Sequence, residues 1–264
     1  MFDCHVHSNF SPDSQITLET GCQIAARKNL LGLIFTDHYE IDWAGKENFY
    51  FDIKERSKKL EQIKEKYASK LKVLKGLEVG FQQHITKELE KVIINSDSDF
   101  IIMSVHSIDK TDASLEDYYL DKTQNHAYEK YLKEVYKSVC NFQDYDVVGH
   151  IGYVRRYGNY NNSDLKYIDY KDILDSILKK VISSGKGIEI NSSGYRQNLG
   201  SPIPDFDIVK RYKELGGEII TLGSDSHTPK TISHSFDLII KKLKDLGFEK
   251  IACFEKRDPK FIKI

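Results

Sequence analysis

The segment FDCHVH, residues 2–7, is a short β-rich run that ends in two histidines. Side chains two residues apart on a strand point to the same face of the sheet. We therefore expect His5 and His7 to reach one metal ion, and Cys4 and Val6 to face the surrounding helices. A chain with nine histidines contains a His-x-His about 0.3 times by chance. The pair is therefore evidence for a metal site only together with the rest of the sequence.

Six more β-rich runs follow along the chain, and each of the seven is followed by a helix-like stretch. The runs cover residues 31–36, 71–79, 99–105, 145–150, 187–191 and 218–224, and the helix-like stretches lie near 17–28, 52–69, 84–95, 124–142, 170–184, 205–215 and 235–246. This alternation favours an α/β fold with parallel strands. At 264 residues it predicts a closed TIM-like barrel in a single domain, residues 1–264. Residues 250–254 predict one more short strand.

The predicted strands share a feature at their carboxyl ends, where each stops at a polar or metal-binding residue. The segments are His5–His7, Thr36–His38, Gly76–Glu78, Ser104–His106, Val148–His150, Glu189–Asn191 and Gly223–His227. Barrels of this type carry their chemistry at that end of the strands. Six of the nine histidines fall there. The other three (His84, His126 and His234) lie in or beside predicted helices and are interpreted as structural or surface residues.

The predicted cluster mixes imidazole with carboxylate, a combination that suits zinc, iron or manganese. Its members outnumber the ligands of one tetrahedral ion; they are His5, His7, Asp13, His38, Glu78, His106, His150, Asp225 and His227. Each histidine taken singly also fits a hydrogen-bonded structural role, and Asp13 also fits a turn residue. The shared position at the strand ends favours a site with more than one ion.

The bulk composition argues against several classes of partner. The chain carries 39 basic and 40 acidic residues, a net charge of −1, so no basic excess indicates a nucleic-acid surface. No apolar run approaches the length of about 18 residues that a membrane span needs, and no secretory signal is visible at the start. The four cysteines show no disulfide spacing. We expect a cytoplasmic protein whose partner is a small molecule, while the oligomeric state is left open.

The strand-end segments together resemble the polymerase and histidinol phosphatase family (PHP). The matching stretches begin at residues 3, 36, 76, 104, 149 and 223 and follow the family's order along nearly the whole chain. Within the family, the chain is most similar to the monofunctional histidinol-phosphate phosphatases, on the segments Gly149–Tyr157 and Glu189–Arg196. The resemblance implies a distorted seven-stranded (β/α) barrel with a centre of three divalent metal ions.

The resemblance also implies a ligand assignment. The first ion would bind His5, His7, Glu78 and Asp225; Glu78 would bridge to a second ion on His106 and His150; and Asp13, His38 and His227 would hold the third. Many relatives carry histidine at position 13, which makes the third site the one that departs from the pattern. Glu78, His106 and Asp225 are the residues to which we assign the chemistry itself.

The implied activity is hydrolysis of a phosphate monoester, with L-histidinol phosphate of histidine biosynthesis as the expected substrate. A hydroxide that bridges two ions would attack phosphorus, because metals lower the pKa of bound water. Arg156 and Arg196, just beyond strand ends, are candidate phosphate clamps, or else surface ion pairs. The loop 39–51, with Trp43, either binds the imidazole and ammonium of the substrate or packs onto the barrel.

Three other readings are compatible with parts of the pattern. A phosphatase of the same family acting on phosphotyrosine or a nucleotide-type phosphate would differ only in its pocket. A nuclease-like or proofreading module is disfavoured by the neutral charge and by the absence of a fused domain. A non-catalytic metal-binding module is disfavoured by the open ligand cluster with two arginines nearby. The acid that protonates the leaving alkoxide is not identified by the sequence.

Overall fold

The computed structural model describes residues 1–44 and 49–264, and within these the central element is one sheet of seven parallel strands. The strand order is β1 (Phe2–Val6), β2 (Gly32–Glu40), β3 (Lys72–Gly80), β4 (Phe100–Ser104), β7 (Val147–Val148), β8 (Gly187–Asn191) and β9 (Ile220–Gly223). Neighbours in space are therefore neighbours in sequence, as expected when each crossover helix returns the chain beside the strand it has left.

The first strand and the segment after the last one meet and nearly close the sheet into a barrel. Val6 bridges Ser226 in parallel orientation, the amide of His7 donates to Ser226 O at 3.0 Å, and the amide of Asp225 donates to His5 O at 2.7 Å. This single zone of contact, in place of a full strand pairing, makes the barrel a distorted one. The predicted seven-stranded (β/α) barrel is confirmed.

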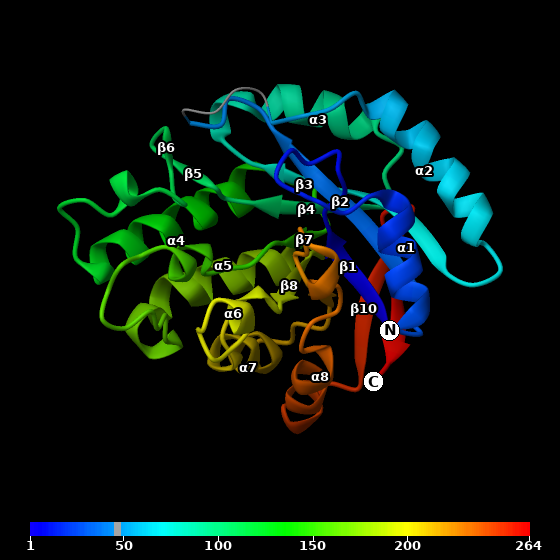
Figure 1. The fold of residues 1–264 in the computed structure, drawn as a ribbon. Coiled ribbons are helices and arrows are strands. Elements are labelled where there is room, and N and C mark those ends of the chain that lie inside the picture. Colours follow the sequence, from blue (N-terminus) through cyan, green and yellow to red (C-terminus); the bar gives the residue numbers. More distant parts are fainter. Residues whose placement is uncertain (45–48) are drawn as a thin grey trace.

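Helices cover the outside of the barrel (Figure 1). They are α1 (Leu18–Arg27), α2 (Ile53–Tyr67), α3 (Thr86–Asn95), α4 (Gln124–Asn141), α5 (Lys171–Ser183), α6 (Ser193–Arg196), α7 (Phe206–Glu214) and α8 (Phe236–Asp245). Thr17 and Asp205 cap α1 and α7 by accepting hydrogen bonds from backbone amides, as their positions in the sequence predict. Short 3₁₀ turns cover Gln83–Ile85, Glu116–Tyr118, Tyr153–Arg156, Tyr167–Tyr170 and Pro229–Thr231.

Two small antiparallel hairpins complete the described elements: β5 (Ser107–Ile108) with β6 (Thr111–Asp112), and β10 (Lys250–Glu255) with β11 (Asp258–Lys263). The strand predicted at 250–254 is thus present, but it pairs with β11 and not with the barrel sheet. Its Ala252, Cys253 and Phe254 pack in one buried cluster with Phe2 and other strand side chains. Among the described residues, no helix combines the length and apolar character needed to cross a bilayer.

The expectation that Cys4 faces the helices is wrong. Its thiol lies 4.0 Å from Ala252 O, in the cluster with β10, whereas Val6 packs with residues of α1 as predicted. The register of β1 against β2 shifts between Asp3 and Val6, and such an irregularity breaks the strict alternation of strand side chains.

Candidate metal centre

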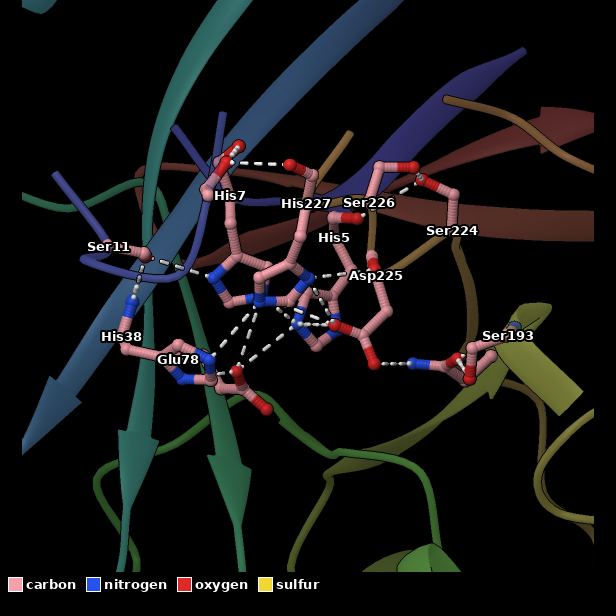
Figure 2. Close-up of polar contacts among 12 residues, drawn as sticks. His5, His7, Ser11, His38, Glu78, Ser193, Ser224, Asp225, Ser226 and His227 are labelled. Atoms are coloured by element: carbon pink, nitrogen blue, oxygen red, sulfur yellow. Dashed lines mark hydrogen bonds and ion pairs between the residues drawn. The ribbon is translucent and has the colours of Figure 1, made fainter. Parts of the chain in front are cut away.

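The predicted ligands come together at the carboxyl ends of the strands. Among the described residues, four groups place nitrogen or oxygen atoms within 4.8 Å of one another; they are His5–His7–Asp225, Glu78–His106–His150, His38–Glu40–His106 and His7–His38–His227. Figure 2 shows several of these side chains converging from separate strands. His84, His126 and His234 belong to none of these groups within residues 1–44 and 49–264.

The three ligand atoms of the first group, taken together with Glu78 Oε2, have the spacing of a tetrahedral site. His5 Nε2 and His7 Nε2 lie 3.0 Å apart, and they lie 3.3 and 3.4 Å from Glu78 Oε2. Their distances to Asp225 Oδ1 are 3.6 and 3.3 Å. Ligands bound at about 2.1 Å to a tetrahedral ion lie about 3.4 Å from one another. These four atoms therefore surround a point where one divalent ion fits.

The second group shares Glu78 with the first. Its Oε1 lies 2.8 Å from His150 Nε2 and 3.5 Å from His106 Nε2, and it accepts a hydrogen bond from Ser104 Oγ at 2.7 Å. Its Oε2 faces His5 and His7, as described above. Because the two carboxylate oxygens face different groups, Glu78 has the geometry of a bridging ligand.

A third set of side chains lies on the open side of the cluster. His38 Nε2 is 3.4 Å from His227 Nε2, and Asp13 Oδ2 lies 3.7 and 3.3 Å from these two nitrogens. The side chains of Asp13 and His227 are 44% and 26% exposed, whereas those of the first two groups are at most 5% exposed. Partial burial raises the pKa of Asp13, but the hydrogen bond from His227 and the nearby charges of His38, His227 and His7 together hold that pKa below its usual range.

The residues present fit metal ions. Glu78 Oε2 and His38 Nδ1 are buried and 2.9 Å apart, yet neither forms a hydrogen bond with any described residue. Buried polar atoms without partners are rare and costly. Such atoms, buried among further imidazoles and carboxylates, fit a site that binds cations.

The charges around the cluster favour a cation as well. Burial lowers the pKa of His5, but the carboxylates of Glu189, Glu78 and Asp225 outweigh it and raise that pKa well above its ordinary value. Burial raises the pKa of Asp225, but neighbouring positive charge, with Arg156 foremost, holds it well below its ordinary value. The buried carboxylates thus remain ionised and create negative potential where the ligand atoms converge.

Two buried glutamates contact ligand histidines and were missed from sequence. Glu40 Oε1 lies 2.6 Å from His106 Nδ1, and Glu189 Oε1 lies 2.5 Å from His5 Nδ1. A third support is a chain of contacts in which Ser11 Oγ lies 3.1 Å from His7 Nδ1 and donates to Asp37 at 3.3 Å. The signal available for the glutamates was their position at or near strand ends, where Glu189 was named from the sequence without being given a role.

The two candidate arginines are partly buried and occupy different places. Arg156 NH2 donates to Asp225 Oδ2 at 2.7 Å and to Ser193 Oγ at 2.7 Å. Arg196 donates to the carbonyl oxygens of Ser224 and Asp225 at 2.7 and 3.0 Å. Among the described residues, Arg156 pairs with the buried carboxylate of Asp225, and neither arginine makes the surface ion pair that was the alternative. Arg155 points elsewhere, toward Ser163 O, Pro202 O and Ser201 Oγ.

A cavity of about 190 Å³ opens onto the cluster. Its lining combines ligand atoms with aromatic side chains: Asp13, His38, Trp43, Glu78, His106, Ser114, His150, Tyr153, Arg156, Tyr157, Asp225 and His227. Trp43 lies stacked on His106, with ring centroids 5.6 Å apart, and also packs against Phe49. This tryptophan of the 39–51 loop therefore both lines the cavity and packs the loop; residues 45–48 lie outside the described residues.

The comparisons with known proteins agree with this geometry. A PHP domain model matches residues 3–193. The chain is 31% identical to a probable histidinol-phosphatase of Clostridium acetobutylicum over 99% of both chains. It is also 31% identical to a histidinol-phosphatase of Lactococcus lactis, over 96% of this chain and 93% of that protein.

Solved structures give the same result. The crystal structure of a histidinol phosphate phosphatase from Lactococcus lactis, in complex with zinc, L-histidinol and phosphate, matches with a TM-score of 0.93 and 31% identity over 98% of each chain. Metal-dependent tyrosine phosphatases of Bacillus subtilis and Streptococcus pneumoniae share the fold, with a TM-score of 0.52 and 16% identity over 94% of this chain and 89% of theirs. From the matched family model and the full-length relatives, the chain belongs to the PHP domain family.

Proposed function

We infer that the protein is a metal-dependent phosphatase that hydrolyses L-histidinol phosphate to L-histidinol and phosphate. The observation that carries this inference is the similarity, over 98% of both chains, to a structure that binds zinc, L-histidinol and phosphate. The cluster of imidazoles and carboxylates described above supplies the chemistry that such a reaction needs. We further propose that the enzyme serves histidine biosynthesis in the cytoplasm and that residues 1–264 form one catalytic domain.

We propose the ligand assignment that the resemblance implies, and the groups His5–His7–Asp225 and Glu78–His106–His150 support its first two ions. His5, His7, Glu78 and Asp225 would hold one ion, Glu78 with His106 and His150 a second, and Asp13, His38 and His227 a third. Zinc is the first candidate because the Lactococcus protein binds it, and iron or manganese also suits this mixture of ligands. When bound, such ions supply an activated nucleophile at neutral pH and neutralise charge on phosphate.

The protein's own groups would bind and orient the phosphate. Arg156 lines the cavity, its guanidinium lies 5.1 Å over the ring of Tyr153, and its buried Nε has no hydrogen-bond partner among the described residues. That N–H is therefore available to a phosphate oxygen. Arg196 already donates two of its N–H groups to the backbone carbonyls of Ser224 and Asp225, so these two are not free to bind phosphate. It would act mainly by holding Asp225 in place, and its phosphate contact is the lesser proposal.

The rest of the substrate would lie against the aromatic wall of the cavity. Trp43, Tyr153 and Tyr157 line it beside the ligand atoms. Aromatic faces suit both an imidazole ring and an ammonium group. The partner is thus a small phosphorylated molecule, and we propose neither a nucleic-acid nor a membrane partner.

One assay tests the assignment most directly. The purified protein, loaded with zinc, iron or manganese in separate samples, is given histidinol phosphate, phosphotyrosine and a nucleoside monophosphate. We expect histidinol phosphate to have the highest kcat/KM with every metal that supports turnover. A higher kcat/KM for either of the other two phosphates would refute the assigned substrate and leave the metal-dependent phosphatase in place.

A further inference from the structure

Glu189, on β8, is a buried carboxylate with three hydrogen-bonding neighbours in the centre. It is 0% exposed. Its Oε1 lies 2.5 Å from His5 Nδ1, and its Oε2 accepts hydrogen bonds from the amide N–H of His150 at 2.8 Å and from Asn191 Nδ2 at 3.1 Å. Both carboxylate oxygens are therefore engaged with residues that are ligands or adjoin them.

The contact with His5 determines which nitrogen faces the metal group. An ionised carboxylate accepts hydrogen bonds and donates none, so His5 carries its proton on Nδ1. The lone pair of His5 then lies on Nε2, the atom that converges with His7, Glu78 and Asp225. A carboxylate behind a ligand histidine fixes its tautomer and ring orientation and makes it a stronger ligand.

The other two contacts extend this support to further ligands. His150 belongs to the second group, and its backbone is held by Glu189 through the amide. Asn191 links Glu189 to Asp225 of the first group, because its Nδ2 also lies 3.4 Å from Asp225 Oδ2. The Glu189 carboxylate thus contacts the first group in two ways: directly at His5, and indirectly through Asn191, which lies beside Asp225. It contacts the second group through the main-chain amide of His150.

The neighbouring strand leaves room for this carboxylate. Gly223 lies in β9, and a Cβ atom added there would come 2.1 Å from Glu189 Oε1 and 2.6 Å from His5 Cβ. Real Cβ atoms do not approach other atoms so closely. A side chain at position 223 would therefore push Glu189 and His5 apart.

We propose that Glu189 is a positioning residue that holds the first and second metal groups in place together. It fixes His5 with Nε2 toward the first group and anchors the main chain of His150 in the second. Asp13, His38 and His227 receive no contact from it among the described residues. The inference rests on the proposed metal centre, and it assigns the support of two ions, and not of the third, to one side chain.

The test compares zinc binding by the wild type, Glu189→Gln and Asp146→Asn. Asp146 is a buried carboxylate that precedes β7 and accepts hydrogen bonds from Ile101 N and Arg257 Nε, so its variant loses a buried charge away from the centre. Zinc is titrated against a chromophoric chelator, the ions retained per chain are counted by mass spectrometry, and the melting temperature of the metal-free protein is recorded. Glu189→Gln should weaken the two tightest sites about 10–100-fold, while Asp146→Asn lowers the melting temperature and keeps wild-type affinities.

Each other outcome has a defined meaning. Wild-type zinc affinity in Glu189→Gln overturns the inference, and so does an equal loss in Asp146→Asn, because affinity would then follow general stability. A wild type that retains no zinc refutes the proposed centre itself. Should Glu189→Gln fail to fold, Glu189→Asp keeps the charge but withdraws it from His5 and His150. It should show the same loss at two sites, and unchanged affinity there counts against the inference.

Discussion

The enclosed and the open parts of the metal centre differ in what lies behind their ligands. His5 and His106, in the enclosed groups, contact the buried carboxylates of Glu189 and Glu40. On the open side, His227 Nδ1 faces the backbone carbonyl of Asp225 at 3.1 Å, and Asp13 is 44% exposed. Buried, supported ligands keep their geometry without a metal, whereas exposed ligands lose solvent contacts and mobility when they bind one. We therefore expect the open group to bind its ion more weakly.

The same difference predicts different roles for the enclosed and the open ligand groups. The enclosed ligands would hold their ions strongly, and the open ligands would hold an ion that exchanges more readily. Ligands of both parts line the cavity beside the centre, Glu78 and His106 as well as Asp13 and His227. Substitutions in the enclosed groups should therefore affect every step, while those in the open group should act in a graded way.

Removing an enclosed ligand should have the largest effect. His106 takes part in two of the ligand groups, so His106→Ala should lower kcat/KM at least about 1,000-fold, since metal assistance contributes several kcal/mol to the transition state. The circular dichroism spectrum should match the wild type, because the barrel core does not depend on this side chain. Steady-state kinetics with histidinol phosphate measure the loss.

The matched control for this variant is His126→Ala on α4, an exposed histidine outside the ligand groups. It should keep wild-type kcat/KM. Turnover like the wild type in His106→Ala would remove the basis of the metal-centre model.

Much of this comparison was accessible from sequence, for a physical reason. Strand periodicity and the rule that barrel chemistry lies at the carboxyl ends depend on backbone geometry alone, so the convergence of His5, His38 and His150 followed from the predicted strands. The exposure of Asp13 was not predictable in that way. It depends on how the loop after β1 folds over the centre.

The residues that support the ligands were harder to predict from the sequence than the ligands themselves. A carboxylate at a strand end has the same local sequence signal whether it binds a metal or orients a histidine, so Glu40 and Glu189 could not be separated from the ligands or from structural residues. The inward position of Cys4 depends on a register shift between Asp3 and Val6 that no alternating pattern predicts. The role of Arg196 depends on the fold of α6, which brings it against the backbone of Ser224.

A change in the open group should have an intermediate effect. Asp13→Asn removes the carboxylate charge from an exposed ligand, and we expect the third ion to bind roughly 10–100-fold more weakly, with the other two unchanged. Asp13→His keeps a ligand atom and should retain most of the affinity. Ions retained per chain across a series of free zinc concentrations measure both. Simultaneous loss of all three ions in Asp13→Asn would show that the open and enclosed groups are not separate.

The smallest effect is expected from an ion pair outside the centre, between Asp175 on α5 and Arg211 on α7. Arg211 Nε and NH2 donate to the two carboxylate oxygens at 2.8 and 2.7 Å. These hydrogen bonds hold the pKa of Asp175 below its ordinary value, so the pair stabilises the fold above pH about 4. That contribution is lost as the pH falls through the depressed pKa.

Asp175→Asn should lower the melting temperature at pH 7 by about 1–3 °C, and the difference should shrink below pH 4. The three zinc affinities should not change, because neither residue contacts the centre. Weaker zinc binding at any site in this variant would mean that the contrast between the groups depends on the scaffold, and not on the carboxylates behind their histidines.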